Sequence, residues 1–486
     1  MQHGERTEHE MSIQAEHSMC RKDVASRDEK PERPEPCVAE LPTARESIVG
    51  RHSACEEVPG GETETLIQKV LQRENMLRAH ERVKRNDGAP GVDGITVDQL
   101  WKLCQERWEQ VREQILSGTY EPQAIRKVEI PKPDGRGMRM LGIPTVMDRL
   151  IQQAVLQVLQ PIFEPTFSDN SFGFRPGRNQ HQALLRAHEH VKEGAEWVVD
   201  LDLEKFFDRV CHDVLMARVA RRVKDKQVLR LIRQFLQAGM MEDGLVSPRT
   251  EGTPQGSPLS PLLSNIMLDD LDKELERRGH SFVRYADDCN VYVHSKAAGD
   301  RVMTSLEEFL KRCLRLRVNR DKSAVARPTE RSFLGYTFYR NREGNMLLKV
   351  AAKSVARLKA KLKPEFRKGR GREFKATLAK VNSITQGWVS YYKLSGTRSI
   401  FASLDGWIRR HLRAIQWRQW RTPSNRRRKV LELGVPTDMA DRVSNQRGPW
   451  CNAQTPVMHK ALGTATLANM GFKSLLDKYL CLAHVL

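Results

Sequence analysis

Two adjacent aspartates interrupt an otherwise apolar stretch between Phe282 and Val293, and this interruption constrains the fold more than any other feature of the chain. The stretch reads Phe-Val-Arg-Tyr-Ala-Asp-Asp-Cys-Asn-Val-Tyr-Val, with the acidic pair at Asp287 and Asp288. Aspartate is disfavoured inside strands and favoured at tight turns. The pattern therefore predicts a β-hairpin whose turn presents carboxylates at the edge of a sheet. An ordinary Asp-Asp turn on a surface hairpin is the alternative.

A second acidic stretch lies upstream, at Trp197–Asp208. Apolar and acidic residues alternate in it, namely Val199, Leu201 and Leu203 with Asp200, Asp202 and Glu204. A period of two places the acids on one face of a strand, which is either a solvated face or part of a metal site. Carboxylates from two strands can hold two Mg²⁺ ions about 3.5–4 Å apart for polymerase phosphoryl transfer. That reading requires Asp202 to lie beside Asp287 and Asp288.

The order and spacing of these stretches resemble the palm of a reverse transcriptase. Phe207 follows Asp202 by five positions, and Gly-Thr-Pro-Gln-Gly-Ser-Pro-Leu-Ser-Pro at Gly252–Pro261 precedes the aspartate pair. Further segments resemble the reverse transcriptases encoded by bacterial and organellar group II introns, namely Asp87–Gly94, Ile130–Gly135, Leu141–Thr145, Ser171–Arg178, Phe333–Tyr336 and Gly387–Tyr392. The similarity extends over roughly residues 65–455.

The resemblance implies an α+β fold of the right-hand polymerase type. Fingers and palm, an antiparallel sheet flanked by helices, would precede an α-helical thumb or maturase domain. We expect a disordered leader at 1–62, an N-terminal extension that holds template together with fingers at 63–195, the palm at 196–340, the thumb at 341–455 and a short tail at 456–486. The leader is rich in Glu, Arg, Ser and Pro, whereas apolar residues at helical spacing from Leu66 onward predict the first helix.

Residues 125–145 predict two short strands around a turn at Pro133–Gly135. The resemblance implies that Lys132 and Arg139, which flank this turn, bind the incoming deoxynucleoside triphosphate (dNTP). Cationic side chains there would neutralise charge that develops on the phosphates. Exposed hairpin cations of no special role are the alternative.

The resemblance assigns three more residues to the nucleotide. Phe207 would lie beneath the sugar, where an aromatic ring collides with a ribose 2′-OH and admits deoxyribose. The amide of Gln255 would contact the nucleotide, and Lys322 would lie near the leaving pyrophosphate as a point charge or proton donor. A solvated lysine is the alternative for Lys322. Phe206 is expected in the core.

Basic residues dominate the composition. The chain has 81 Lys and Arg against 61 Asp and Glu, a net charge of +20 and a pI near 9.7, which favours a polyanionic partner. No acid occurs between Gly406 and Val430, where Trp407, Trp417 and Trp420 alternate with cations and some of the Trp are expected in the core. The resemblance implies a thumb that grips intron RNA; the candidate RNA-binding residues are Arg175, Arg178, Arg409, Arg410, Arg413, Arg426, Arg427 and Arg428.

The nine cysteines form no Cys-x-x-Cys pair, so neither a zinc ribbon nor a disulfide framework is indicated. No apolar run approaches the roughly 20 residues that span a bilayer. We expect a bacterial cytoplasmic protein associated with the nucleoid. Members of the family commonly end in an HNH endonuclease, but only about 30 residues follow Gly448–Ala453, and His459 and His484 have no ligand cluster. We therefore expect no endonuclease, with priming from nicks or replication intermediates.

Two functional hypotheses remain, with a third beside them. The first is an RNA-directed DNA polymerase of a mobile intron, with intron RNA, target DNA, primer and dNTPs as partners, which copies the intron into cDNA during retrohoming and assists splicing. The second is an RNA-binding maturase that keeps the polymerase fold as a scaffold, and the third a domesticated polymerase outside any intron. The presence of Asp202, Asp287 and Asp288 with Phe207 and Gln255 favours the first. Nothing in the sequence specifies an oligomeric state.

Overall fold

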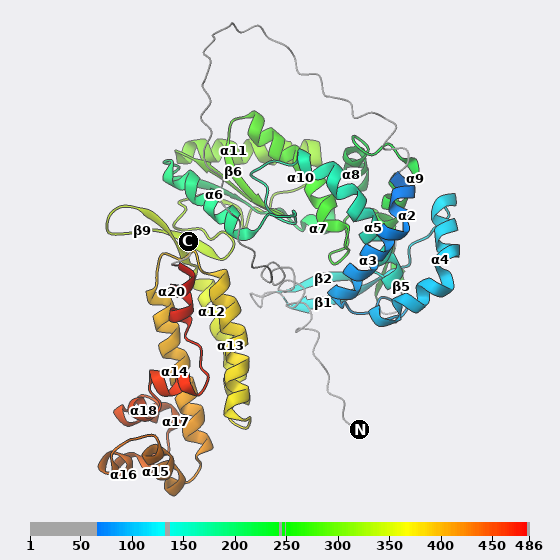
Figure 1. Ribbon diagram of the computed structural model, residues 1–486. Coiled ribbons are helices and arrows are strands. Elements are labelled where there is room, and N and C mark those ends of the chain that lie inside the picture. Colours follow the sequence, from blue (N-terminus) through cyan, green and yellow to red (C-terminus); the bar gives the residue numbers. More distant parts are fainter. Residues whose placement is uncertain (1–65, 132–136, 243–244, 248, 484–486) are drawn as a thin grey trace, which may run out of the picture.

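The computed structural model describes residues 66–131, 137–242, 245–247 and 249–483 (Figure 1). The predicted leader, the turn at 133–135 with Lys132, and His484 lie outside these residues. The described chain forms an α+β fingers and palm region followed by an extended stack of helices, so the predicted fold class is confirmed.

The fingers are built on a four-stranded sheet. Strand β1 (Ile125–Pro131) pairs antiparallel with β2 (Met138–Ile143), which confirms the hairpin predicted over residues 125–145. Strand β4 (Met240–Glu242) joins β1 in parallel and pairs antiparallel with β5 (Leu245–Ser247). A segment expected in the palm thus contributes two strands to the fingers, because the chain returns to this sheet after its first passage through the palm.

Helices surround the fingers sheet. They are α2 (Leu66–Leu71), α3 (Arg73–Asn86), the 3-10 turns η1 (Val97–Gln99) and η2 (Glu164–Thr166), α4 (Leu100–Ser117), α5 (Val146–Phe163) and α9 (Lys226–Gln237). The helix predicted from Leu66 is present, with a break at Gln72. Helix α5 is central to this part of the molecule. Thr145 caps its N-terminus by accepting a hydrogen bond from the Asp148 nitrogen.

The palm sheet is antiparallel, in the order β6-β7-β3-β8. Its strands are β3 (Trp197–Leu201), β6 (Ser281–Tyr285), β7 (Asp288–Val293) and β8 (Ala324–Ala326). Strands β6 and β7 form the hairpin predicted around the aspartate pair. Alternate residues of the sheet pack in different cores, since successive side chains point to opposite faces.

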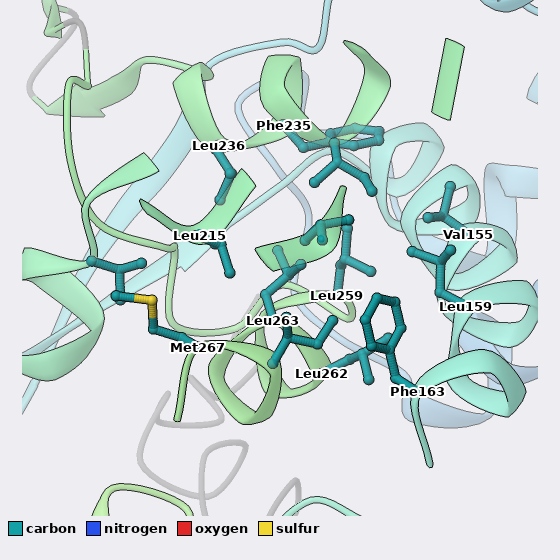
Figure 2. Packing of buried hydrophobic residues seen from close by; sticks show 14 of the residues in the cluster. Val155, Leu159, Phe163, Leu215, Phe235, Leu236, Leu259, Leu262, Leu263 and Met267 are labelled. Carbon is teal, nitrogen blue, oxygen red and sulfur yellow. The ribbon is translucent and has the colours of Figure 1, made fainter. Parts of the chain in front are cut away.

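One face of the palm sheet, with Val199, Leu201 and Val291, belongs to the core shared with α10 (Ser260–Arg277) and α11 (Lys296–Phe309). That core continues into the fingers. Figure 2 shows where α5, α9, α10 and α8 (His212–Val219) meet, with Val155, Leu159, Phe163, Leu215, Phe235, Leu236, Leu259, Leu262, Leu263 and Met267 packed together.

The opposite face, with Val198, Val283 and Tyr292, packs with α6 (Gln180–Lys192) in a second core that extends into the thumb. Helix α6 lies within the segment expected as fingers, yet it covers the palm sheet. A linear boundary at residue 195 therefore does not separate fingers from palm.

The thumb begins with a two-stranded sheet, β9 (Tyr336–Arg340) and β10 (Met346–Val350). Long helices follow, namely α12 (Ala352–Lys368), α13 (Phe374–Tyr391) and α14 (Ser399–Gln419), and then short ones, α15 (Pro423–Glu432), α16 (Thr437–Ser444), α17 (Pro449–Asn452), α18 (Pro456–Ala461), α19 (Thr464–Asn469) and α20 (Leu475–Ala483) (Figure 1). Helix α20 returns to pack on α13 and α14, and Phe472 and Leu475 are buried, which confirms that the tail packs on the thumb.

None of the helices in the described ranges is both long and apolar enough to cross a membrane.

Candidate active site

The register of the palm sheet brings Asp202 to the aspartate pair. Strand β3 pairs with β7 so that Asp200 lies opposite Asn290. The next and last pair of the ladder is Leu201 with Cys289, and one step beyond it the antiparallel register puts Asp202 beside Asp288. On its other side, the Lys322 Nζ lies 3.6 Å from the Asp202 Oδ1. The structure thus brings together two of the predicted carboxylates and the predicted lysine.

Backbone contacts hold Asp202 in place just beyond the end of β3. The Ser323 hydroxyl accepts a hydrogen bond from the Asp202 nitrogen at 2.9 Å. The Asn319 nitrogen donates to the Asp202 carbonyl at 2.8 Å. Since both backbone groups of Asp202 are engaged, its side chain keeps a defined direction at the sheet edge.

The predicted alternation of acids along one strand face ends earlier than expected. Lys205 adopts a left-handed conformation with φ of 47°, and the chain turns into the short helix α7 (Phe206–Arg209). Glu204 therefore lies outside the strand and pairs with Arg209 at 2.8 Å, so it does not extend the acidic face. Phe206 is in the core, as expected, although the strand does not continue to it. Phe207 is only partly buried.

Backbone hydrogen bonds connect the segment that carries Gln255 to Phe207 of the palm and to β2 of the fingers. The Thr253 nitrogen donates to the Phe207 carbonyl at 2.6 Å, and the Gly142 nitrogen of β2 donates to the Gln255 carbonyl at 2.7 Å. Gly256 has φ of 111°, and a Cβ there would lie 2.8 Å from the Gly142 carbonyl oxygen. This close approach of the Pro-Gln-Gly turn to β2 requires glycine.

The hairpin turn carries the other two carboxylates, and its shape is unusual. Ala286 has φ of 57°, a conformation that costs a non-glycine residue free energy. Loss of hydration raises the pKa of Asp287, and the nearby charge of Asp202 raises it further, whereas the charge of Arg139 lowers it. Arg139 of the fingers is therefore within electrostatic reach of Asp287.

Asp288 has the most perturbed carboxylate of the three. Surrounding protein atoms reduce the hydration of the Asp288 carboxylate although the residue is exposed, and Asp287, Asp200 and Asp202 add negative charge. Together they raise its pKa to about 7, against the opposing effect of Lys322. Repulsion of this kind is relieved when a cation binds.

Arg331 and Asp200 complete the surroundings of the site, and sequence reasoning gave Arg331 no role. The Arg331 Nε donates to the Asp200 Oδ2 at 2.7 Å, and its Nη2 donates to the carbonyl of Lys322. Arg331 thus ties β3 to the segment that carries Lys322. Its only signal in the sequence is its position two residues before the Phe333–Tyr336 motif.

The donor set of the three aspartates suits Mg²⁺, which takes few protein carboxylates and completes its shell with water and phosphate oxygens. Within the described ranges, no three His, Cys, Asp or Glu side chains already converge as ligands of one ion. The residues present are instead neighbouring carboxylates that repel one another. That arrangement fits an open site shared with substrate phosphates.

Three of the arginines predicted to bind RNA are buried, which corrects the expectation for them. Arg175 donates to the carboxylate of Glu164 at 2.8 Å and to the carbonyl of Ser171 at 2.8 Å. Arg413 donates to the carbonyls of Leu462 at 2.9 Å and Ala453 at 3.4 Å. Arg426 donates to the Gln446 carbonyl at 3.0 Å. Guanidinium groups that satisfy protein carbonyls in the interior cannot also reach phosphates.

The remaining predicted RNA contacts reach the surface at least partly. Arg178 pairs with Asp169, and Arg410 stacks on the ring of Trp450, 3.8 Å from its centroid. Arg427 and Arg428 are exposed, and they pair with Asp441 and Glu432 respectively. Arg409 is partly exposed. Trp417 and Trp420 are buried, as expected for some of the Trp residues.

Known proteins resemble this chain in two consecutive regions. Residues 130–338 match the family described as reverse transcriptase (RNA-dependent DNA polymerase), and residues 355–433 match the group II intron, maturase-specific domain. Protein YkfC of Escherichia coli (strain K12) is 33% identical in an alignment of 325 positions that covers 58% of this chain and 85% of that protein.

The group II intron-encoded protein LtrA of Lactococcus lactis subsp. cremoris is 40% identical over 208 residues. The aligned part is 43% of this chain but only 34% of LtrA, so the similarity spans about a third of that relative's length. Among solved structures, a chain of a partial Cas6-RT-Cas1--Cas2 complex has 22% identity and a TM-score of 0.34, covering 51% of this chain and 42% of that one.

Proposed function

The chain belongs to the family of group II intron-encoded reverse transcriptases and maturases, and from this premise we propose that it is an RNA-directed DNA polymerase that copies intron RNA into cDNA and assists intron splicing. The observation that carries the polymerase half is the continuation of the β3–β7 register, which puts Asp202 beside Asp288 with Lys322 at 3.6 Å. The maturase half rests on the match of residues 355–433.

Asp202, Asp287 and Asp288 would hold two Mg²⁺ ions, which supply charge neutralisation for the attacking and leaving oxygens when bound. The raised pKa values of Asp287 and Asp288 support this role, because carboxylates that repel one another gain most from a cation. Lys322 would act near the leaving pyrophosphate as a point charge or proton donor.

The fingers and palm residues would orient the nucleotide. Arg139, and Lys132 by its place in the sequence, would provide cations for the triphosphate. Phe207 excludes a ribose 2′-OH by steric contact. Gln255 is supported in this role by the backbone bonds that bring its turn to β2 and its neighbour Thr253 to Phe207.

Intron RNA would bind a surface formed by the arginines that remain exposed or partly exposed. These are Arg178 beside α6, Arg409 and Arg410 on α14, and Arg427 and Arg428 on α15. Phosphate contacts suit such a surface because RNA is recognised largely through shape and backbone. The weak surface ion pairs of Arg427 and Arg428 can be exchanged for phosphates at little cost.

We assign the template-holding extension and fingers chiefly to residues 63–195, the palm to 196–340, and the thumb to 341–455 with the tail at 456–486 packed on it. Two segments are exceptions: the strands β4 and β5 join the fingers sheet, and helix α6 packs on the palm sheet. The protein would act on intron RNA, target DNA, primer and dNTPs at the nucleoid of the bacterial cytoplasm.

The test separates synthesis from splicing in one protein. Wild type and Asp287→Ala are compared in primer extension on an intron RNA template with a DNA primer, with Mg²⁺ or with excess chelator. The same preparations are added to intron precursor RNA at a Mg²⁺ concentration too low for self-splicing. We expect synthesis by wild type alone and splicing with both proteins.

A wild-type protein that promotes splicing but extends no primer would favour the alternative in which the polymerase fold is only a scaffold. Synthesis without any effect on splicing would instead favour a polymerase that has lost its intron. Near-normal synthesis by Asp287→Ala would refute the assignment of the carboxylates.

A further inference from the structure

A fully buried ion pair lies directly beneath the aspartate turn. It joins Arg284 of β6 to Asp272 of α10, and neither side chain has any exposed surface. The Arg284 Nε donates to the Asp272 Oδ1 at 2.7 Å, and its Nη2 donates to the Oδ2 at 2.5 Å. This two-bonded fork fixes the plane of the guanidinium.

The same guanidinium holds the backbone of the turn. Its Nη1 donates to the carbonyl of Ala286 at 2.8 Å, between Tyr285 and Asp287. Ala286 is the residue with φ of 57°, so this hydrogen bond acts on the strained point of the turn. The direction of the Ala286 carbonyl determines the peptide plane that precedes Asp287.

The other bonds of Arg284 reach two more segments. Nη1 also donates to the Asn265 side-chain oxygen at 3.0 Å, and Nη2 donates to the Ser171 hydroxyl at 2.7 Å. Asn265 in turn donates to the Gly173 carbonyl at 2.9 Å. All the polar atoms of this network are therefore connected, as a buried network must be to avoid a large penalty.

The loop that carries Ser171 and Gly173 lies against the turn from below. The Phe172 nitrogen donates to the Arg284 carbonyl at 2.9 Å. A Cβ at Gly173 would overlap the Ala286 nitrogen, so only glycine allows this contact. The turn is thus supported both by the backbone of this loop and by the guanidinium.

Stability alone does not account for such a pair. Removing two charges from water is costly, and well-packed apolar residues of the same volume are often as stable. The chain keeps this pair where one donor of the guanidinium reaches the Ala286 carbonyl, directly before the proposed metal ligands Asp287 and Asp288. A hydrogen bond that orients a metal-binding segment affects metal affinity even though it does not touch the ion.

We propose that Arg284 is a positioning residue that, anchored by Asp272 and Asn265, fixes the Ala286 carbonyl and thereby the directions of the Asp287 and Asp288 carboxylates toward divalent cations. The inference rests on the proposed function, since it concerns the same carboxylates. It adds to the three aspartates a set of buried residues behind them, which α10 and the loop containing Ser171 contribute.

The main variant is Arg284→Lys. Lysine keeps a positive charge opposite Asp272, but one ammonium group cannot replace the planar fork that also reaches Asn265, Ser171 and Ala286. We expect the Mg²⁺ concentration for half-maximal primer extension to rise about tenfold, the range found when outer partners of metal ligands are removed. Affinity for intron RNA should not change.

A matched control removes a buried carboxylate far from the turn. Asp225 is buried, caps α9 through the nitrogens of Gln227 and Val228, and accepts from the Ile67 nitrogen at 2.9 Å. Asp225→Asn should lower the melting temperature without shifting the Mg²⁺ requirement. A milder second variant, Asn265→Ala, keeps the ion pair and removes one contact of Arg284, and it serves if Arg284→Lys does not fold.

The second measurement does not depend on synthesis. Mn²⁺ binding is followed by electron paramagnetic resonance in a complex with RNA template, a dideoxy-terminated primer and the matching dNTP. We expect weaker Mn²⁺ binding by Arg284→Lys and Asn265→Ala than by wild type and Asp225→Asn.

Equal Mn²⁺ affinity and equal Mg²⁺ requirement in the Arg284 and Asp225 variants, at equal folded fraction, would overturn the inference. A wild-type protein that binds Mn²⁺ but synthesises no DNA would contradict the proposed function only. In that case the difference between the Arg284 and Asp225 variants in Mn²⁺ binding still decides the role of Arg284.

Discussion

The palm hairpin and thumb helix α14 both place charged residues among apolar ones, with opposite results. In the hairpin, Asp287 and Asp288 stay near the surface, while Arg284 behind them is buried to support their turn. In α14, Arg413 is itself buried and donates to the Leu462 carbonyl of the segment between α18 and α19. A high density of charge along a sequence therefore does not define a charged surface.

The difference follows from the chemistry of the two side chains. A carboxylate can only accept hydrogen bonds when ionised, and a protein interior offers it few donors beyond the backbone nitrogens. A guanidinium has five donors and a long apolar stem, so it can satisfy several carbonyls that helix ends leave without partners. Buried arginines such as Arg413 and Arg426 thus join short helices whose ends would otherwise be unsatisfied.

The largest effect is expected at the palm, where two neighbouring acids should behave differently. Asp202→Asn should lower the rate of cDNA synthesis at least about a hundredfold, as much as the loss of one essential electrostatic group. Asp200→Asn should cost less than about tenfold, since Asp200 pairs with Arg331. Single-turnover primer extension measures both. Equal losses of rate would mean that Asp200 is as important for synthesis as Asp202.

The next prediction tests the buried side of the thumb. Arg413→Ala leaves the carbonyls of Leu462 and Ala453 without their donor, which should reduce the free energy of unfolding by about 1–3 kcal/mol. Arg409→Ala, on the same helix but partly exposed, should change it by at most about 0.5 kcal/mol. Urea unfolding monitored by tryptophan fluorescence compares them. A loss of RNA salt dependence in Arg413→Ala, without loss of stability, would contradict its structural role.

Sequence reasoning succeeded where the pattern is local. Alternating and interrupted apolar runs gave the β6–β7 hairpin and the fingers hairpin, because strand faces and turn residues are determined by neighbours in the chain. It also gave Asp202 and Lys322 as neighbours of one site, through the resemblance.

It failed where distant segments decide. Glu204 was expected on the strand, but β3 ends at Leu201, and the Glu204 nitrogen donates to the carbonyl of Arg317, more than 100 residues later in the chain. Burial of Arg413 depends on segments about 40 and 50 residues later in the chain. A signal existed for Arg284, since a single arginine in an apolar strand is seldom buried without a partner. The identity of that partner, Asp272, required the structure.

A third prediction concerns the sugar. Phe207→Ala should remove the steric block to a ribose 2′-OH and reduce the preference for dCTP over rCTP by about tenfold, the scale of a modest change in pocket shape. Competition between the two nucleotides on one template measures the preference. Phe206→Leu is the control, because it changes a neighbouring aromatic that lies in the core. An unchanged preference in Phe207→Ala would place the block elsewhere.

A smaller effect, on RNA affinity, is expected from substitutions on the exposed surface of the thumb. Reversing charge at Arg427 and Arg428 together should weaken intron RNA binding severalfold and reduce the slope of log affinity against log salt by roughly one unit per lost contact. Arg426 is left unchanged because it is buried. Filter binding at several salt concentrations measures the slope.

The control for that experiment is Lys311→Glu with Arg312→Glu, which changes the net charge equally at exposed positions just after α11, outside the fingers and the thumb. An equal change of slope in both double variants would show that RNA responds to net charge alone. The palm carboxylates are untouched in either variant, so short primer extension should persist in both.

The smallest expected effect comes from a change of pH, which should affect the palm site but not RNA binding by the thumb. Because the pKa of Asp288 is raised to about 7, lowering the pH from 7.5 to 6.5 protonates it in a large share of molecules. Metal ligands must be deprotonated, so the Mg²⁺ concentration for half-maximal synthesis should rise about threefold. Arginines stay charged at both pH values, and RNA binding should not change.

The sign of the linked stability change provides an independent check. A carboxylate whose folded pKa is raised stabilises the fold when protonated, and that contribution is lost as the pH rises through about 7. The metal-free protein should therefore melt at a lower temperature at pH 8 than at pH 6, and Mg²⁺ should restore more stability at pH 8. Asp288→Asn should remove most of this dependence. If the melting temperature of Asp288→Asn depends on pH as strongly as that of wild type, other groups cause the dependence. The palm and the thumb would then not differ in their response to pH.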